Sequence, residues 1–242
     1  MARQLITDAV REGRILVSDG ACGTFLQQHG MEPGECPELW NVTHPDVIRD
    51  MAEKYIEAGS DMVQTNSFGG SRYKLEAFDL SDRTVELNKA ASTLAREAVG
   101  EDHWVIASVG PTGKMILMGD VTEADLYNAF KEQAQALAGG GADGICVETM
   151  SAIDETVQAV KAAKENTGCE VISTLTYEPS KQGGYRTMMG VSPTEGAQAA
   201  LDAGADIIGT NCGNGIDGMI DIVKEIRAVD AEVPIIVHAN AG

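Results

Sequence analysis

One short device recurs three times in this chain and constrains its fold more than any other feature. Residues 58–61 read Ala-Gly-Ser-Asp, residues 140–143 read Gly-Gly-Ala-Asp, and residues 203–206 read Ala-Gly-Ala-Asp. Each follows an amphipathic stretch and precedes an apolar run, as expected where a glycine ends a helix and a short loop enters a strand. Helices and strands that alternate at this spacing predict a parallel sheet with right-handed crossovers.

The same alternation extends along the whole chain. The predicted strands are residues 15–17, 62–66, 104–109, 144–147, 171–176, 207–213 with its closing turn, and 235–240. The predicted helices are residues 5–14, 25–29, 46–58, 80–99, 122–137, 153–166, 193–203 and 218–229. A (β/α)₈ TIM barrel needs eight strands, whereas only about seven are found here. The alternatives are an open, doubly wound sheet, or a barrel domain over residues 1–242 that lacks its last βα unit.

Composition limits the functions that fit. A length of 242 residues with 43% hydrophobic residues suits a single α/β core. The formal net charge of −19 repels phosphate backbones and argues against a nucleic-acid partner. No stretch has the roughly 18 consecutive apolar residues of a membrane helix, and no signal peptide is recognisable. Five cysteines do not make a disulfide framework at this length, so we expect a cytoplasmic protein with reduced thiols.

Polar residues gather where the predicted strands end. Parallel strands of a barrel bring their carboxyl ends to one rim, where active sites are built. The residues at these positions are Asp19 with Gly20, Thr65 with Asn66, Gly110 to Thr112, Glu148 with Thr149, Thr176, Asn211 with Cys212, and Asn240. Two carboxylates can act as a general acid/base pair or hold an ammonium group. Asp19 could instead form an Asx turn, whereas a carboxylate that follows Ile145-Cys146-Val147 needs a partner near the core.

Cys212 lies in an Asn-Cys-Gly turn at the end of the sixth predicted strand. It is either a small packed residue, as most free cysteines are, or a thiol presented to the rim. Cys22 could also reach a pocket at the rim. The loop of residues 32–41 could lie over that pocket.

Six short motifs occur in one order, each at a strand end: residues 19–24 (Asp-Gly-Ala-Cys-Gly-Thr), 65–70, 110–113, 148–149, 211–212 and 240–242. In this combination the chain resembles the homocysteine S-methyltransferase family, from about residue 10 to Gly242. That family includes the homocysteine-binding domain of cobalamin-dependent methionine synthase and the betaine–homocysteine methyltransferases.

The resemblance implies a (β/α)₈ barrel with a catalytic zinc. Cys212 matches one zinc ligand, while the family's pair of adjacent cysteines after the eighth strand has no counterpart up to Gly242. Asp19 and Glu148 match acidic residues that hold the amino group of the substrate, and Asn240 matches an asparagine near the metal. The substrate site so implied consists of Asp19, Gly20, Thr65, Asn66, Glu148 and Asn211, with backbone N–H groups near Asn66 for the carboxylate.

The implied activity is methyl transfer to the thiol of homocysteine, which forms methionine. A methyl donor or a corrinoid protein would be the partner, with cobalamin on another domain or protein. Two alternatives stay open: a corrinoid-linked methyltransferase with another substrate, and a metal-free barrel that binds an amino acid.

Overall fold

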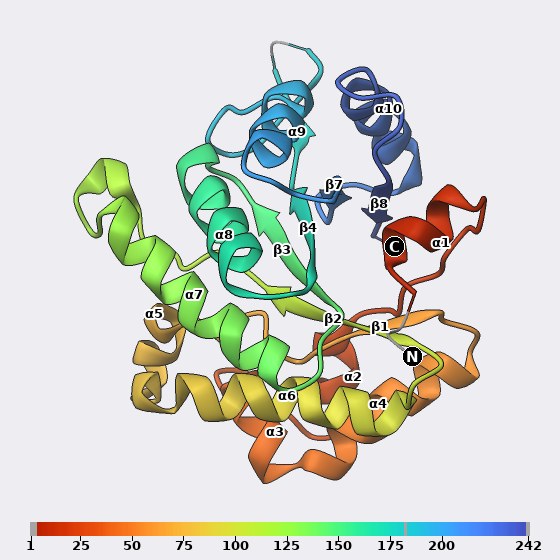
Figure 1. Cartoon of the computed structure of the whole chain (residues 1–242). Helices are drawn as coiled ribbons and strands as arrows, with labels where there is room; N and C mark the ends of the chain where they lie inside the picture. The colour runs from red at the N-terminus through yellow and green to blue at the C-terminus, as the bar shows by residue number, and fades with distance from the viewer. Residues whose placement is uncertain (1–3, 182, 241–242) are drawn as a thin grey trace.

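The computed structural model describes residues 4–181 and 183–240 as alternating helices and strands (Figure 1). The strands are β1 (Met62–Gln64), β2 (Trp104–Val109), β3 (Gly144–Met150), β4 (Glu170–Leu175), β5 (Glu178–Pro179), β6 (Tyr185–Arg186), β7 (Ile207–Asn211) and β8 (Ile235–His238). The α-helices are α1 (Ile6–Arg11), α2 (Cys22–Gln28), α3 (Trp40–Thr43), α4 (Pro45–Glu57), α5 (Arg72–Leu75), α6 (Thr84–Val99), α7 (Glu123–Gly139), α8 (Ile153–Asn166), α9 (Pro193–Asp202) and α10 (Ile216–Arg227). Four 3₁₀ turns connect them: η1 (Pro37–Leu39), η2 (Glu76–Phe78), η3 (Ser81–Arg83) and η4 (Ile116–Met118).

Six of these strands form one parallel sheet in the order β1-β2-β3-β4-β7-β8. Each strand pairs with the next strand of the sheet along the chain, so the strand order never reverses. A doubly wound sheet has such a reversal, and that alternative is therefore wrong. The sheet curls as in a barrel, with helices packed against its outer face (Figure 1). The short β5–β6 hairpin, which we did not predict, is antiparallel and separate from the sheet.

The first predicted strand, residues 15–17, is wrong as a buried strand. The structure has only an isolated parallel bridge, between Ser18 and Met62. Ile15 is 93% exposed and Val17 is 53% exposed. No strand among residues 4–181 and 183–240 pairs with the other side of this run, so Ile15 and Val17 remain exposed at an open edge.

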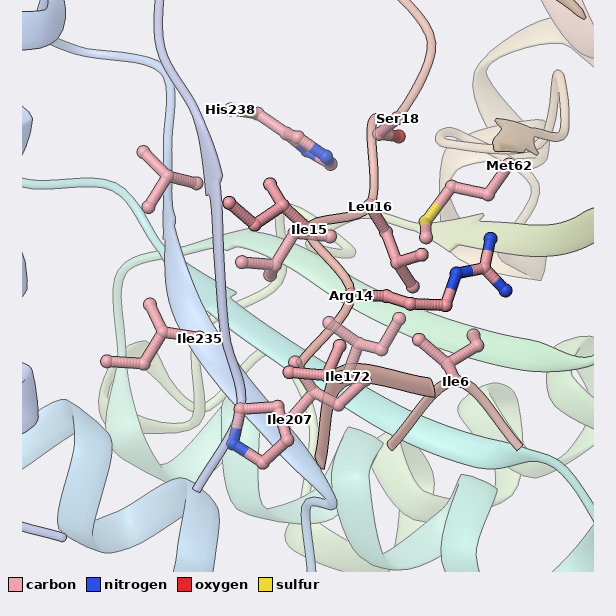
Figure 2. Close-up of a pocket in the computed structure, with 14 residues that line it drawn as sticks. Ile6, Arg14, Ile15, Leu16, Ser18, Met62, Ile172, Ile207, Ile235 and His238 are labelled. Carbon is pink, nitrogen blue, oxygen red and sulfur yellow. The ribbon is translucent and has the colours of Figure 1, made fainter. Parts of the chain in front are cut away.

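A cleft separates this edge from β8 at the other end of the sheet. It encloses about 260 Å³ and is lined mainly by apolar side chains. Figure 2 shows His238 on one side of the cleft, with Leu16 and Ser18 on the other. The His238 imidazole is largely buried, which lowers its pKa, and its Nε2 has no hydrogen-bond partner. Within residues 4–181 and 183–240, then, the sheet does not close into an eight-stranded barrel.

The recurring glycine and aspartate device is confirmed, and it joins each helix to the sheet in the same way. The glycines Gly59, Gly141 and Gly204 adopt φ values of 104°, 104° and 103°, a conformation that favours glycine. Each aspartate accepts a backbone N–H from the neighbouring strand position at 2.8 Å: Asp61 from Val17, Asp143 from Val105 and Asp206 from Val171. The aspartate's own N–H returns a hydrogen bond to the same residue's carbonyl in all three cases. The device therefore fixes the register between adjacent strands as well as the end of the helix.

Helix α1 covers the inside of the sheet at the end opposite the strand carboxyl termini. Ile6 and Ala9 pack there on Met62, Ile106 and Ile172 in one buried cluster. Glu170, at the start of β4, accepts the backbone N–H groups of Ile6 and Thr7. These are donors that a helix N-terminus leaves unpaired, and a carboxylate is favourable beside them.

Several predicted boundaries shift. The helix predicted over residues 80–99 begins at Thr84 after a 3₁₀ turn, and the loop predicted over residues 32–41 is helical from Pro37 onward. Thr43 ends α3, and His44 precedes α4. Among the helices that the structure describes, none has the length and apolar character needed to cross a membrane.

Candidate functional site at the carboxyl rim of the sheet

A pocket of about 530 Å³ opens where the strands end. Its lining includes Gly20, Cys22, Glu38, Gln64, Thr65, Asn66, Phe68, Lys74, Ser108, Glu148, Thr149 and Cys212. The loops after β1, β3 and β7 and the turn after Ser18 all contribute. Of the predicted site residues, Gly20, Thr65, Asn66, Glu148 and Cys212 line the pocket, while Asp19 and Asn211 lie directly behind its wall and bond to residues in it.

Glu148 is the centre of the polar network in this pocket. Its side chain is held by three donors: Ser108 Oγ, Gln64 Nε2 at 3.1 Å and Asn211 Nδ2 at 3.4 Å. Burial raises the pKa of the carboxyl, and the hydrogen bonds from Ser108 and Gln64 act in the opposite direction. A buried carboxylate with one weakly paired oxygen, Oε2, is suited to receive a cation.

Glu148 lies within a register shift near the end of β3. Strand β3 continues to Met150, beyond the predicted end at Val147, and its register against β4 shifts between Val147 and Met150. Thr149 has a positive φ of 59° within this shift. Bulges commonly redirect a side chain next to an active site.

Asp19 lies behind the end of β1. Its Oδ2 accepts the backbone N–H of Gln64 at 2.7 Å, and its Oδ1 accepts Ser18 Oγ at 3.1 Å. Burial raises the pKa of Asp19 to about 7, and the nearby Glu148 adds to this shift. The two predicted carboxylates are therefore close enough to interact, as expected for a shared counter-charge.

Asn211 joins the ends of β3 and β7. Its Oδ1 accepts Thr149 N–H at 3.0 Å and Thr174 Oγ1 at 2.9 Å, while its Nδ2 donates to Thr149 Oγ1 and to Cys212 Sγ. Cys212 is exposed at the rim and has a positive φ of 56°. Residues other than glycine seldom adopt such φ values, and those that do are often found at functional sites. Burial, followed by the charge of Glu148, raises the pKa of the Cys212 thiol.

Thr65 and Asn66 line the pocket, but their side chains bond to the protein itself. Asn66 Nδ2 donates to the Pro37 carbonyl at 2.7 Å and to Asn41 Oδ1 at 3.1 Å. Asn41 Nδ2 returns a hydrogen bond to the Asn66 carbonyl. Thr65 Oγ1 accepts the Ser108 N–H. The predicted loop of residues 32–41 thus reaches the pocket wall and is fastened there through the Asn66 amide nitrogen.

Other strand-end residues have structural partners or lie outside the pocket. The Thr112 hydroxyl and N–H both donate to Glu155 of α8, which turns this residue away from the site. Gly110 leaves room for the Phe68 ring, since a Cβ there would lie 2.5 Å from it. Asn240 is exposed, and its N–H bonds to the Asn214 carbonyl. Asn240 does not line the pocket.

Four polar residues that line the pocket were not predicted from the sequence: Gln64, Ser108, Glu38 and Lys74. Gln64 and Ser108 lie inside predicted strands, one or two positions before the strand ends. Only the residues at the ends themselves were considered as site candidates. Glu38 comes from the loop over the pocket, is buried, and accepts the Gly69 N–H at 2.7 Å. Burial raises its pKa. Only its proximity to Pro37 in a loop expected over the pocket could have indicated it.

The residues of the pocket do not form a metal site among themselves. Over the described part of the chain, no group of three or more His, Cys, Asp or Glu side chains is placed to hold a metal ion. A zinc site needs at least three protein ligands. Cys212 has the right chemistry and exposure to be one of them, and Asn240 is not placed with it in the pocket.

A parallel sheet in sequential order, with a polar pocket built from the loops at its carboxyl rim, defines a barrel-type α/β protein. Comparison with known proteins places it more closely. A family model described as homocysteine S-methyltransferase matches residues 16–242, and the chain belongs to that family.

Curated relatives agree with this assignment. The chain is 32% identical over 247 residues to methionine synthase of Mycobacterium leprae (strain TN), which covers 95% of this chain and 20% of that protein. It is 29% identical over 210 residues to betaine–homocysteine S-methyltransferase 1 of Danio rerio, covering 86% of this chain and 51% of the relative. The chain thus spans about a fifth of the length of the methionine synthase it matches.

Solved structures show the same fold. The metallated homocysteine methyltransferase MmuM from Escherichia coli superimposes with a TM-score of 0.81 at 19% sequence identity, over 97% of this chain and 86% of that one. The apo form of the same enzyme gives a TM-score of 0.76.

Proposed function

We propose that this chain transfers a methyl group to the thiol of homocysteine and so forms methionine, alone or as part of a methionine synthase. The observation that supports this most is the pairing of Glu148 with Cys212 in one pocket through the Asn211 amide. It combines a buried acceptor for an ammonium group with a thiol at the rim, in a chain that belongs to the homocysteine S-methyltransferase family.

In this proposal the protein binds and orients the methyl acceptor, and the donor supplies the methyl group. Glu148 and, from behind, Asp19 supply negative charge for the ammonium group. The sulfur of the substrate then points toward the rim beside Cys212, where the donor arrives. A sulfur–carbon bond forms as the bond from the methyl carbon to the donor breaks, and the thiol proton is lost to solvent. Such a site accelerates the reaction mainly by holding the two reactants in line.

Cys212 is the one residue of the pocket that we assign as a zinc ligand. We propose that Cys212 is one thiolate ligand, and that the other ligands come from residues outside those described. Asn240, proposed from the family resemblance as a residue near the metal, would have to move toward the rim to take part. Cobalamin, where it is the donor, would be carried by another domain or protein that meets the open mouth of the pocket.

The experiment compares wild-type protein, in its complete natural polypeptide, with Cys212→Ser and the matched control Cys169→Ser. Cys169 is a free, partly buried thiol that bonds to the Ala142 carbonyl and lines a different cavity. Zinc content is measured by atomic emission, and methionine formation by chromatography with several methyl donors. We expect Cys212→Ser to lose the metal and the transfer, while Cys169→Ser keeps both.

Other results would identify the alternatives. If Cys212→Ser keeps its zinc and activity, Cys212 is only a packed thiol. Homocysteine binding without zinc or transfer in the wild type would favour the amino-acid-binding barrel. Transfer to another acceptor, with none to homocysteine, would favour the corrinoid-linked enzyme.

We also propose that the cleft of Figure 2 takes one further strand, parallel to β8, which closes the barrel. The outer edge of β8 pairs with no other strand of the described chain, and Ser18 at the opposite edge has only the bridge to Met62. One strand between them would satisfy both edges and cover Ile15 and His238. A crystal structure of the complete natural polypeptide with this cleft open to solvent would contradict the proposal.

A further inference from the structure

Gln64, the last residue of β1, connects the two carboxylates of the site. Its backbone N–H donates to Asp19 Oδ2 at 2.7 Å, and its side-chain Nε2 donates to Glu148 Oε1 at 3.1 Å. Its side chain lines the pocket, whereas Asp19 does not. Gln64 is therefore the residue that stands between Asp19 and the space where a substrate would lie.

The orientation of the Gln64 amide leaves an acceptor for the pocket. A primary amide has two donors on its nitrogen and an acceptor oxygen on the other branch. Because Nε2 faces the Glu148 carboxylate, Oε1 is directed away from Glu148. Within the described residues no group donates a hydrogen bond to Gln64 Oε1. This oxygen is also not one of the fully buried unpaired atoms of the structure. The oxygen is therefore accessible.

Asp19 has less capacity to contact a substrate directly. Both of its oxygens already accept hydrogen bonds, one from Ser18 Oγ and one from the Gln64 backbone. Glu148 Oε2, in contrast, has only the long contact of 3.4 Å with Asn211. An ammonium group has three N–H donors that must each find an acceptor when water is excluded.

We propose that Gln64 contacts the substrate's ammonium group directly through Oε1, beside Glu148 Oε2, and so contributes to the selection of an α-amino acid. This inference rests on the proposed function, because it takes homocysteine as the occupant of the pocket. Asp19 then acts through Gln64: it fixes the end of β1 and adds negative charge from behind the wall. A thiol that lacks the amino group leaves Gln64 Oε1 and Glu148 without their donor.

The experiment is a double-mutant cycle with two ligands. Gln64→Leu, Glu148→Gln and the double variant are compared with wild type, and Gln198→Leu serves as control because Gln198 is an exposed glutamine on α9. Affinities for L-homocysteine and for 4-mercaptobutanoate, which is homocysteine without its amino group, are measured by calorimetry. Circular dichroism confirms that each variant is folded.

A direct contact has a specific signature. Gln64→Leu should weaken L-homocysteine binding by roughly tenfold or more, as expected for a hydrogen bond to a charged group, and it should change the affinity for 4-mercaptobutanoate by less than about twofold. It should also weaken L-homocysteine binding in the Glu148→Gln background, since the contact does not depend on Glu148. The Gln198→Leu control should match wild type.

Other results would distinguish a failure of the Gln64 contact from a failure of the proposed function. A loss that disappears in the Glu148→Gln background would show that Gln64 only orders Glu148, and equal losses for both ligands would show a general effect on the pocket. Either result overturns the inference and leaves the proposed function intact. If wild-type protein binds no L-homocysteine, the proposed function fails and the role of Gln64 fails with it.

Discussion

Replacing Asp19 with Asn should make the stability of the protein relative to wild type rise between pH 5 and pH 8, and it should weaken substrate binding. The carboxyl of Asp19 is mostly buried, and this burial raises its pKa to about 7 from an ordinary value of 3.8. The folded protein therefore holds a proton that the unfolded chain has already lost over the range between these values. The resulting stability is complete below the unfolded pKa and is lost as the pH rises through the folded pKa.

The magnitude follows from the two pKa values. At pH 5 and above the unfolded carboxyl is mostly ionised, whereas the folded one ionises at about pH 7. Each pH unit between 5 and 7 therefore costs the folded state about 1.4 kcal/mol, and the loss stops near pH 8. Asparagine cannot ionise and avoids this loss. Relative to wild type, Asp19→Asn should gain about 3 kcal/mol between pH 5 and pH 8.

Urea unfolding at pH 5, 6, 7 and 8 measures this difference directly. The Asp102→Asn variant, which carries the same substitution at an exposed aspartate, is measured alongside as the control. A constant offset between Asp19→Asn and wild type, produced by the changed hydrogen bonds to Gln64 and Ser18, does not affect the result, because only the pH dependence is used. A difference that stays flat, or that falls as pH rises, would refute the argument from burial.

Three further predictions follow from the same structure. Glu148→Gln should weaken L-homocysteine binding by a factor of roughly ten to a hundred in calorimetry, because a charge-assisted hydrogen bond contributes about 1.5–3 kcal/mol; unchanged affinity would remove Glu148 from the binding site. Gly209→Ala should destabilise the protein by more than about 3 kcal/mol in urea unfolding or prevent folding, since its Cβ would lie 1.9 Å from the Ile236 carbonyl oxygen; a variant of wild-type stability would contradict the tight β7–β8 packing. Asp206→Ala should cost about 1–3 kcal/mol by the same measurement, because it leaves the buried N–H of Val171 without its acceptor; a loss below about 0.5 kcal/mol would mean that water replaces the carboxylate.

Sequence reasoning predicted the fold best where local chemistry is repeated. Glycines with positive φ end the helices before β1, β3 and β7, as the Gly-x-Asp pattern indicates. The pattern did not show what the aspartates do. Their bonds to Val17, Val105 and Val171 join positions that lie 35 to 44 residues apart, and no local signal reports such a distant partner.

The first strand failed for a similar reason. Residues 15–17 are apolar, and Ile15 and Val17 are β-branched, which favours a strand locally. A strand, however, exists only where a neighbour pairs with it, and the one bridge here is made by the following residue, Ser18, to Met62. Its pairing depends on what lies across the cleft from β8, and that is a property of the whole sheet.

The sequence indicated candidate site residues at the ends of predicted strands, and it did not indicate those within the strands. Residues at the ends of the predicted strands, such as Glu148 and Cys212, are visible in a sequence because a polar side chain interrupts an apolar run. Gln64 and Ser108 belong to the strands themselves, where alternation allows either face. Which face points into the sheet's concave side follows only from the register, and the register places both beside Glu148.

The two strained residues of the rim show why this network has to be built as a unit. Thr149 and Cys212 both have positive φ values, although neither is glycine. Each such residue costs of order 1–3 kcal/mol and persists only when its surroundings fix it. The Asn211 side chain bonds to both of them and to Glu148. One buried amide therefore bonds both to the end of β3, where Glu148 lies, and to the turn that presents the Cys212 thiol, so it connects the two ends of the site.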